Sequence, residues 1–229
     1  MAEITAALVK ALRDKTDAGM MDCKKALNEC NGDMDAAVKY LREKGIAKAA
    51  AKADRDAKEG VIRAAVAPCG CSGIILELNC ETDFCAKGDK FQGLVNDVAN
   101  ALMDSKASTL EEALQVPMAE GSTEEYIKAM CSSIGENMAL RKFARLTADG
   151  IGAVVSYIHM GGKIGVLVSF ATEGVDTTTA EFAQCGRDVA MQVAAVDPIA
   201  TSREDVDPAV VEHEMGIYKA QAAESGKPE

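Results

Sequence analysis

The sequence predicts an α+β protein with a three-helix head, a linker, a core of two related small antiparallel-sheet/helix subdomains, and a C-terminal helix. Two patterns carry this prediction. Near the N-terminus, apolar residues recur every three or four positions, which is typical of helices that bury one face. Later, two strand-like runs around a glycine-containing turn are followed by a helical segment, and this order occurs twice. Two small sheets, each covered by helices on one side, would bury both repeats.

The head, residues 1–45, is predicted to contain three helices separated by short turns at Ala18-Gly19 and Asn31-Gly32. Asp33 is placed to cap the third helix, and Gly45 is placed to end it. The apolar residues expected to face one another are Ile4, Leu8 and Leu12, then Met20, Cys23, Ala26, Leu27 and Cys30, then Met34, Val38 and Leu41. So short a domain has a small core, so we expect marginal stability in isolation.

The stretch "IAKAAAKADRDAKEG", residues 46–60, combines alanine with charges of both signs. This composition predicts a solvated helical linker. Because acidic residues are interleaved with the basic ones, a solvated face is favoured over a nucleic-acid-binding patch.

The core is predicted to contain two hairpin-helix units, in residues 61–150 and 151–205. The hairpins lie in "GVIRAAVAPCGCSGIILELNCETDF" and "GAVVSYIHMGGKIGVLVSFAT". Helices are expected after them, at 91–104 and 180–196, and a further helix is expected at 122–146. The buried face of the first of these helices is expected to comprise Phe91, Leu94, Val95, Val98 and Leu102.

Residues 206–229 are predicted to form a C-terminal helix, with Pro208 in its first turn. Its apolar stripe is Val211, Met215, Tyr218 and Ala222. The sequence holds no later segment to cover this stripe, and a lone helix of this length is marginal in water. We therefore expect the helix to fray or to pair with another chain, as in a homodimer.

The net charge of −11 is unevenly distributed. Residues 1–60 hold 12 Lys+Arg against 11 Asp+Glu, whereas residues 61–229 hold 13 against 25. An acidic body repels phosphate backbones, so direct nucleic-acid binding is not expected. No stretch approaches the roughly 20 apolar residues of a membrane span, and the N-terminus lacks the apolar core of a signal peptide. We therefore expect a cytoplasmic protein whose eight cysteines are reduced thiols.

The sequence contains no convincing active site. Cys69, Cys71, Cys80 and Cys85 lie within seventeen residues, but a predicted strand separates the first two from the others. Structural zinc sites usually take cysteine pairs with two to four residues between them, so buried or incidental thiols are favoured and no metal is expected. There is no phosphate-binding loop, and neither histidine has an apparent catalytic partner. A binding protein without a cofactor is therefore favoured over an enzyme.

Four motifs resemble, in the same order, segments of the elongation factor Ts family. They are "TDAGMMDCKKAL", "ILELNCETDFCAK", "IGENMALRKFAR" and "SYIHMGGKIGVLV". This family comprises guanine-nucleotide exchange factors for elongation factor Tu, the GTPase that carries aminoacyl-tRNA to the ribosome. The resemblance therefore implies a translation factor that promotes GDP release so that GTP can rebind. It also implies that the head is a ubiquitin-associated-like (UBA-like) domain.

The resemblance further implies which residues contact elongation factor Tu. They are Arg13, Met20, Met21, Asp83, Phe84, Ile134 and His159. The first three match head residues that touch the nucleotide-binding domain of the GTPase, and the last two match core positions that face another of its domains. Asp83 and Phe84, together with Thr82, match the segment that displaces Mg²⁺ from the partner. Cys85 stands where the family usually has Val. The family usually continues beyond residue 229 through a helical arm, so a fragment or a short member is expected.

Phe84 has two interpretations on the residues alone. It could be an exposed aromatic wedge for a partner, held in place by Asp83 as a helix cap. It could instead share a buried helical face with Phe91, seven residues later, and the residues alone favour this interpretation because apolar residues at helical spacing are usually core residues. Gly88 argues against the shared face because a break there would separate the two aromatics. With the resemblance, the wedge is the favoured interpretation.

Met20 and Met21 raise a similar question, because methionines at helical spacing are usually core residues. Two consecutive residues of a helix cannot both face inward, so at least one of the two is expected to be exposed. A different function also stays open, a UBA-type helical adaptor without exchange activity, in which the body only supports binding by the head. An enzyme with a cysteine metal site is a more distant alternative.

Overall fold

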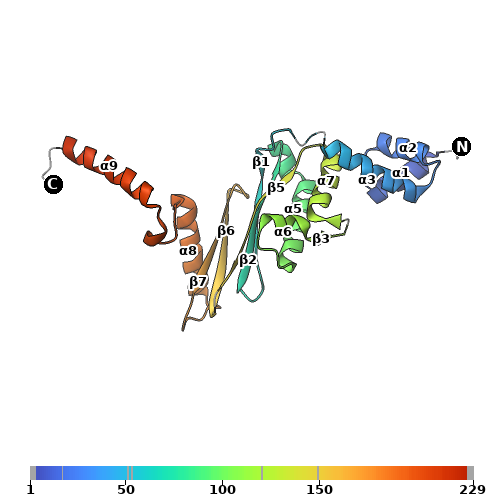
Figure 1. Ribbon diagram of the computed structural model, residues 1–229. Coiled ribbons are helices and arrows are strands. Elements are labelled where there is room, and N and C mark those ends of the chain that lie inside the picture. The colour runs from blue at the N-terminus through green and yellow to red at the C-terminus, as the bar shows by residue number, and fades with distance from the viewer. Residues whose placement is uncertain are drawn as a thin grey trace. The chain divides into compact units, whose positions relative to one another are not determined.

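The computed structural model describes residues 4–16, 18–50, 52, 54–119, 121–148 and 150–225. The chain divides into two units, Met1–Met191 and Gln192–Glu229. Figure 1 follows it from three N-terminal helices, through the strands and their covering helices, to the C-terminal helix. Within the described residues, no helix is both long enough and apolar enough to cross a membrane.

The predicted three-helix head is confirmed. Its helices are α1 (Ala6–Thr16), α2 (Met20–Glu29) and α3 (Met34–Ala50). Asn31 and Gly32 make the second turn with left-handed φ values of 51° and 86°. Asp33 caps α3, since its Oδ1 accepts hydrogen bonds of 3.0 Å from the backbone N–H groups of Asp35 and Ala36. The buried hydrophobic core of the head comprises Val9, Leu12, Cys23, Ala26, Leu27 and Ala37.

The predicted end of the third helix at Gly45 is wrong, because α3 continues to Ala50. Gly45 is buried, and a Cβ at this position would lie 3.4 Å from the Cβ of Ser132. This glycine therefore lies inside the helix, beside Ser132 of α7, and does not form a left-handed turn that would end it. The helical linker predicted for 46–60 is also wrong beyond Ala50, since residues 52 and 54–58 are not helical.

The first sheet has three antiparallel strands in the order β1-β2-β5. They are β1 (Glu59–Val66), β2 (Ser72–Cys80) and β5 (Ala139–Thr147). The register of the hairpin runs from Glu59 opposite Cys80 to Val66 opposite Gly73. The predicted hairpin in the first unit is therefore confirmed.

The helix predicted over 122–146 is wrong in its second half. The helix α7 (Thr123–Ile134) ends at Gly135, which has a left-handed φ of 97°. The following residues form β5 and pair with β2 through a register shift at Glu77 and Leu78. Hydrogen bonding to the open edge of β2 decides the conformation here, whereas the apolar spacing had suggested one continuous helix.

Three further helices belong to the first unit. They are α4 (Asp83–Lys87), α5 (Asp89–Asp104) and α6 (Leu110–Gln115). The predicted buried face of α5 is confirmed, and its five apolar residues lie in one core cluster with Ile74, Leu76 and Leu78 of β2. The short helix α6 and the two-residue strands β3 (Pro117–Met118) and β4 (Gly121–Ser122) were not predicted.

The second hairpin and its helix are also confirmed. They are β6 (Gly152–His159), β7 (Ile164–Ala171) and α8 (Ala180–Val196). A Cβ on Gly73 of β2 would lie 2.9 Å from Val154, whereas a Cβ on Gly186 of α8 would lie 2.7 Å from Val155. Neighbouring residues of β6 thus face opposite layers, the β1-β2-β5 sheet on one side and α8 on the other. Figure 1 shows this order, with α5 and α7 beyond the first sheet.

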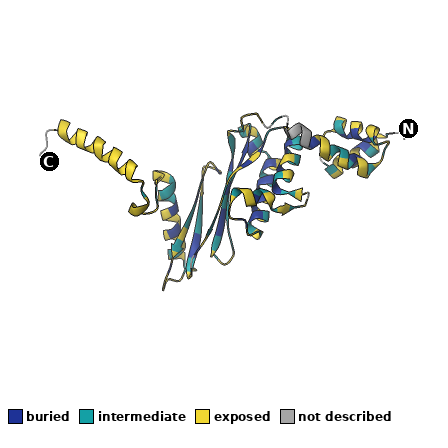
Figure 2. Ribbon diagram, in the orientation of Figure 1, coloured by how far each residue is buried: buried dark blue, intermediate teal, exposed yellow. Residues whose placement is uncertain are grey.

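The predicted C-terminal helix is α9 (Pro208–Glu224), and it follows a single 3-10 turn, η1 (Arg203–Asp205). Asp207 caps α9 with a hydrogen bond of 2.8 Å from the N–H of Ala209 to its Oδ1. Every residue of α9 is exposed (Figure 2). Residues 226–229, the last of the predicted segment, lie outside the described residues.

The expectation that all eight cysteines are reduced is wrong for one pair. Cys69 and Cys71 form a disulfide in the turn between β1 and β2. Gly70, between them, has a left-handed φ of 69°, which reverses the chain so that both sulfurs meet. The other six cysteines are free thiols.

Candidate functional site

The segment after β2 presents its residues on a very short helix, α4. Thr82 is extended, with φ −126° and ψ 153°, and its hydroxyl accepts a hydrogen bond of 3.1 Å from the N–H of Cys85. The predicted cap at Asp83 is therefore wrong, because Thr82 is the cap and Asp83 is the first helical residue. Asp83 instead pairs with Lys87 at 2.8 Å, one helical turn later. This lysine holds the pKa of the Asp83 carboxyl below its ordinary value.

Phe84 is exposed, and the interpretation that it shares a buried face with Phe91 is wrong. The exposed fraction is 83% for Phe84 and 1% for Phe91. The reason is Gly88, which ends α4 and begins α5 with an extended conformation of φ −72° and ψ 141°. This break gives the two helices different axes, so seven-residue spacing no longer places the two rings on one face.

Glu136 holds this segment from the loop between α7 and β5. Its Oε2 accepts hydrogen bonds of 3.0 Å from the backbone N–H groups of Glu81 and Thr82, and its Oε1 accepts one of 2.7 Å from the Thr82 hydroxyl. Burial acts to raise the pKa of the Glu136 carboxyl, but these hydrogen bonds outweigh it and hold the pKa below its ordinary value. In return, Glu81 accepts a hydrogen bond of 2.6 Å from the N–H of Asn137.

Sequence reasoning missed Glu136. Its only local signal is the Gly135 before it, since a glycine that ends a helix places the next residues in a loop. The pairing with Thr82 is invisible in the sequence because 54 positions separate the two residues.

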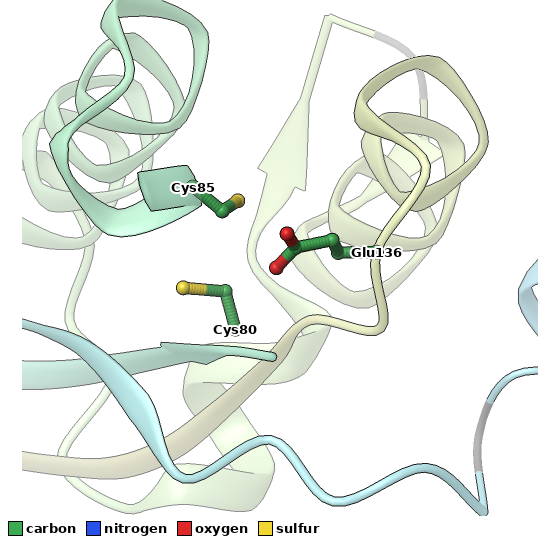
Figure 3. Close-up of side chains that lie close together, drawn as sticks. All are labelled: Cys80, Cys85 and Glu136. Carbon is green, nitrogen blue, oxygen red and sulfur yellow. The ribbon is translucent and has the colours of Figure 1, made fainter. Parts of the chain in front are cut away.

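Cys80 and Cys85 lie beside Glu136 (Figure 3). The two sulfurs and a carboxylate oxygen all lie within 4.8 Å of one another. The Cys80 thiol donates a hydrogen bond of 3.2 Å to the carbonyl of Thr82. Burial raises the pKa of both thiols above the ordinary value, and for Cys85 the neighbouring Cys80 and Glu136 add to this effect. As expected from the sequence, β2 separates these cysteines from the Cys69–Cys71 pair.

His159 ends β6 and is exposed, and its Nδ1 lies 2.8 Å from the hydroxyl of Tyr157. The following turn, residues 160–163, has three consecutive left-handed residues, which end with Gly162 at φ 97°. The turn is fixed to β1 by a hydrogen bond of 2.7 Å from the N–H of Ile62 to the carbonyl of Gly162.

The turn after His159 lies at the same end of the core as α4. Lys163 forms an ion pair with Glu59, the residue that faces Cys80 across the β1-β2 hairpin. Lys163 also acts to lower the pKa of Asp83. The structure therefore brings the predicted residue His159 close to the segment that carries Phe84.

The other predicted residues divide between the head and the core. Arg13, Met20 and Met21 lie in α1 and α2, and the exposed fractions of the two methionines are 48% and 76%. At least one exposed methionine was expected. Both are exposed, so the placement of Met20 among the inward-facing residues of the second helix is wrong. Ile134 ends α7 and is partly buried against the core cluster, so only part of its side chain is accessible.

The chain matches known proteins over almost its whole length. The family model described as elongation factor TS matches residues 81–229. Elongation factor Ts of Trichlorobacter lovleyi is 48% identical over 231 residues, which cover 99% of this chain and 74% of that protein. Elongation factor Ts of Clostridium perfringens is 47% identical over 227 residues, with the same coverage. The family-model match begins at Glu81 and thus includes α4 and Glu136, whereas the two relatives also match the three-helix head.

Proposed function

The chain belongs to the elongation factor Ts family, and on this premise we propose that the α4 segment of its core is the part that acts on elongation factor Tu. The chain is a translation elongation factor that promotes nucleotide exchange on elongation factor Tu. It acts by binding and is not a catalytic enzyme. What needs explanation is therefore how its surface favours the nucleotide-free state of the partner.

Exchange requires only a difference in binding. A factor can bind the nucleotide-free GTPase more tightly than the GDP-bound form. It then lowers the affinity of the GTPase for GDP by the ratio of its own two affinities, because linkage is reciprocal. A coupling of about 1–3 kcal/mol changes affinity about 5–150-fold, so larger effects need several contacts. The exposed residues of the head and of the core together provide such contacts.

The observation that carries the proposal is the exposure of Phe84 on a helix that is fixed at its start. Phe84 is 83% exposed, so it contributes little to the packing of the core. The cap at Thr82 and the three hydrogen bonds to Glu136 fix the backbone that presents it. A rigid aromatic can fill a partner pocket at small entropic cost, which is typical of binding hot spots.

Thr82, Asp83 and Phe84 are proposed to displace Mg²⁺ from elongation factor Tu. Asp83 lies directly before Phe84, and its carboxyl is ionised at neutral pH, as an aspartate ordinarily is. The carboxylate of Asp83 would come near the bound Mg²⁺ while the ring of Phe84 enters the same site. Together they would disturb the coordination of Mg²⁺, since this ion demands near-ideal geometry.

A second set of contacts is proposed for the head and for the second hairpin. Arg13, Met20 and Met21 form the head contact, in which flexible methionine side chains adapt to the partner. His159 contributes from the turn beside α4. Ile134 contributes only through the accessible part of its side chain, because the remainder packs in the core.

The test is the release of labelled GDP from elongation factor Tu, with and without the full-length chain. We expect Phe84→Ala to slow stimulated release strongly, and Met21→Ala to slow it less, through weaker binding. Lys39→Ala is a matched control, because Lys39 is an exposed residue of α3 outside the proposed contacts. Release that is as fast with Phe84→Ala as with the wild-type chain would refute the role of α4.

The organisation and setting of the protein complete the proposal. We assign residues 1–45 to a UBA-like head, 61–150 and 151–205 to the two core subdomains, and 206–229 to a C-terminal helix, in a cytoplasmic protein. The large hydrophobic residues that α9 exposes are Val210, Val211, Met215, Ile217 and Tyr218. A second copy of the chain that covers them would form a homodimer. Light scattering at increasing concentration tests this, and a constant monomer mass would refute it.

A further inference from the structure

Three side chains with metal-binding atoms meet beside the cap of α4. They come from separate elements, Cys80 from the end of β2, Cys85 from α4 and Glu136 from the loop before β5 (Figure 3). Each pair of ligand atoms lies within 4.8 Å. Around a tetrahedral zinc ion, with Zn–S of about 2.3 Å and Zn–O of about 2.0–2.2 Å, neighbouring ligand atoms lie about 3.5–4 Å apart. Small rotations of these side chains are therefore enough to place all three around one ion.

The three ligands are held by hydrogen bonds that converge on Thr82. Its N–H and hydroxyl orient the carboxylate of Glu136, and its hydroxyl also accepts from the N–H of Cys85. Its carbonyl accepts from the Cys80 thiol in the metal-free chain, and this bond is lost when the metal takes the sulfur as a thiolate and the proton is released to solvent. Outer-shell contacts of this kind orient ligands in metal sites and are important for affinity. A carboxylate oxygen that accepts one hydrogen bond keeps a lone pair for a metal.

The ligand set selects the class of ion. Thiolates bind soft and borderline cations such as Zn²⁺, whereas Mg²⁺ and Ca²⁺ require oxygen ligands. Cys80 is buried, but Cys85 and Glu136 are half-buried, so an ion can enter from their side. Three protein ligands would leave one coordination position for water.

From this arrangement we propose that Cys80, Cys85 and Glu136 bind one thiophilic divalent cation, of which Zn²⁺ is the best match. The bound ion would join the start of α4 to the loop before β5 and so reinforce the hydrogen bonds of Glu136. This proposal replaces the expectation of no metal, which considered only the four cysteines between Cys69 and Cys85. It does not depend on the proposed role of α4 in nucleotide exchange.

The test uses the full-length chain, reduced and freed of metal with a chelator. Zn²⁺ is titrated by calorimetry, and Co²⁺ is titrated as a spectroscopic substitute whose visible bands report thiolate ligands. We expect one ion per chain and thiolate-to-cobalt charge transfer in the wild-type protein. We expect Cys85→Val, which leaves Cys80 as the one thiolate of the site, to weaken Co²⁺ binding and lower the charge-transfer intensity, and Glu136→Gln to weaken Zn²⁺ binding at least about tenfold, by analogy with losses of metal-site partners.

The matched control is the double variant Cys69→Ser with Cys71→Ser, which removes the two cysteines of the turn before β2, both of them thiols once the chain is reduced. It should bind Zn²⁺ as the wild-type chain does. Circular dichroism checks that Cys85→Val is folded, and Glu136→Gln provides a second variant that keeps both thiols. The proposal is overturned if no stoichiometric binding occurs, if Cys85→Val binds as tightly as the wild-type chain, or if binding is lost in the double serine variant.

Discussion

Phe84→Ala separates a residue used for binding from one used for folding. Phe84 is 83% exposed, so only about a sixth of its surface is buried. With about 200 Å² for a phenylalanine side chain, about 35 Å² is covered, and at about 25 cal/mol per Å² its loss costs about 1 kcal/mol. We therefore expect the variant to unfold at nearly the same urea concentration as the wild-type protein.

The same truncation should have a larger effect on binding to elongation factor Tu than on stability. Loss of an aromatic anchor from the centre of an interface typically costs about 2 kcal/mol or more. This corresponds to a roughly 30-fold change in affinity or rate. Stimulated release of labelled GDP from elongation factor Tu, measured at several concentrations of the variant, gives this factor directly.

Phe91→Ala is the matched control, because the same change is made seven residues later at a side chain that is 1% exposed. It should destabilise the protein by about 3–5 kcal/mol. The reasoning fails if Phe84→Ala loses as much stability as Phe91→Ala, or if it stimulates GDP release at the wild-type rate.

Three further predictions concern the rest of the chain. The amides of α9 should exchange with deuterium far faster than those of α5 in a monomer, because no residue of α9 is buried; protection equal to that of α5 would contradict this. Gly162→Ala should cost more than about 1 kcal/mol in urea unfolding, since its Cβ would lie 2.8 Å from Val61 at φ 97°, and Gly161→Ala, which has open space, should cost less. Hydrogen bonds from the N–H of Ser108 and, to a smaller extent, from its hydroxyl hold the pKa of the Glu112 carboxyl below its ordinary value, so the stability that this carboxylate contributes is present at neutral pH and is lost on acidification. The difference in melting temperature between the wild-type chain and Glu112→Gln should therefore be largest near neutral pH and vanish in acid; a difference that grows in acid would refute the assignment.

Local sequence patterns predicted the structure correctly where neighbouring residues determine the conformation of a segment. The apolar face of α5 and the bounds of α8 followed from periodicity, because one side of each helix packs on a sheet. The turn at Asn31-Gly32 and the cap at Asp33 followed from residues that favour left-handed or capping geometry. The exposure of Phe84 was favoured only through the family resemblance, because helical spacing alone favoured a buried face shared with Phe91, although Gly88 weakened that interpretation.

Local sequence patterns failed where contacts with a distant segment determine the conformation. The residues of β5 carry spacing that suits a helix, but the open edge of β2 recruits them as a strand. Gly45 suggested a helix end, but α3 continues through this residue, which lies beside Ser132. The support of α4 by Glu136 could not be found from the sequence, because it depends on how β5 brings its preceding loop back to Thr82.

The distance along the chain between Glu136 and Thr82 has a consequence for synthesis. A ribosome releases the chain from its N-terminus, so Phe84 emerges before the residue that holds its helix has been made. The β1-β2 hairpin can form early because its partners are close in sequence, but one edge of β2 stays unpaired until β5 follows. During that interval the nascent chain exposes both an aromatic side chain and an open strand edge, which is the combination that favours aggregation and chaperone binding. The contacts that β5 and Glu136 make with β2 and Thr82 hold the α4 segment in place. Because these contacts form late in synthesis, the α4 segment is the last part of the first subdomain to reach its final structure.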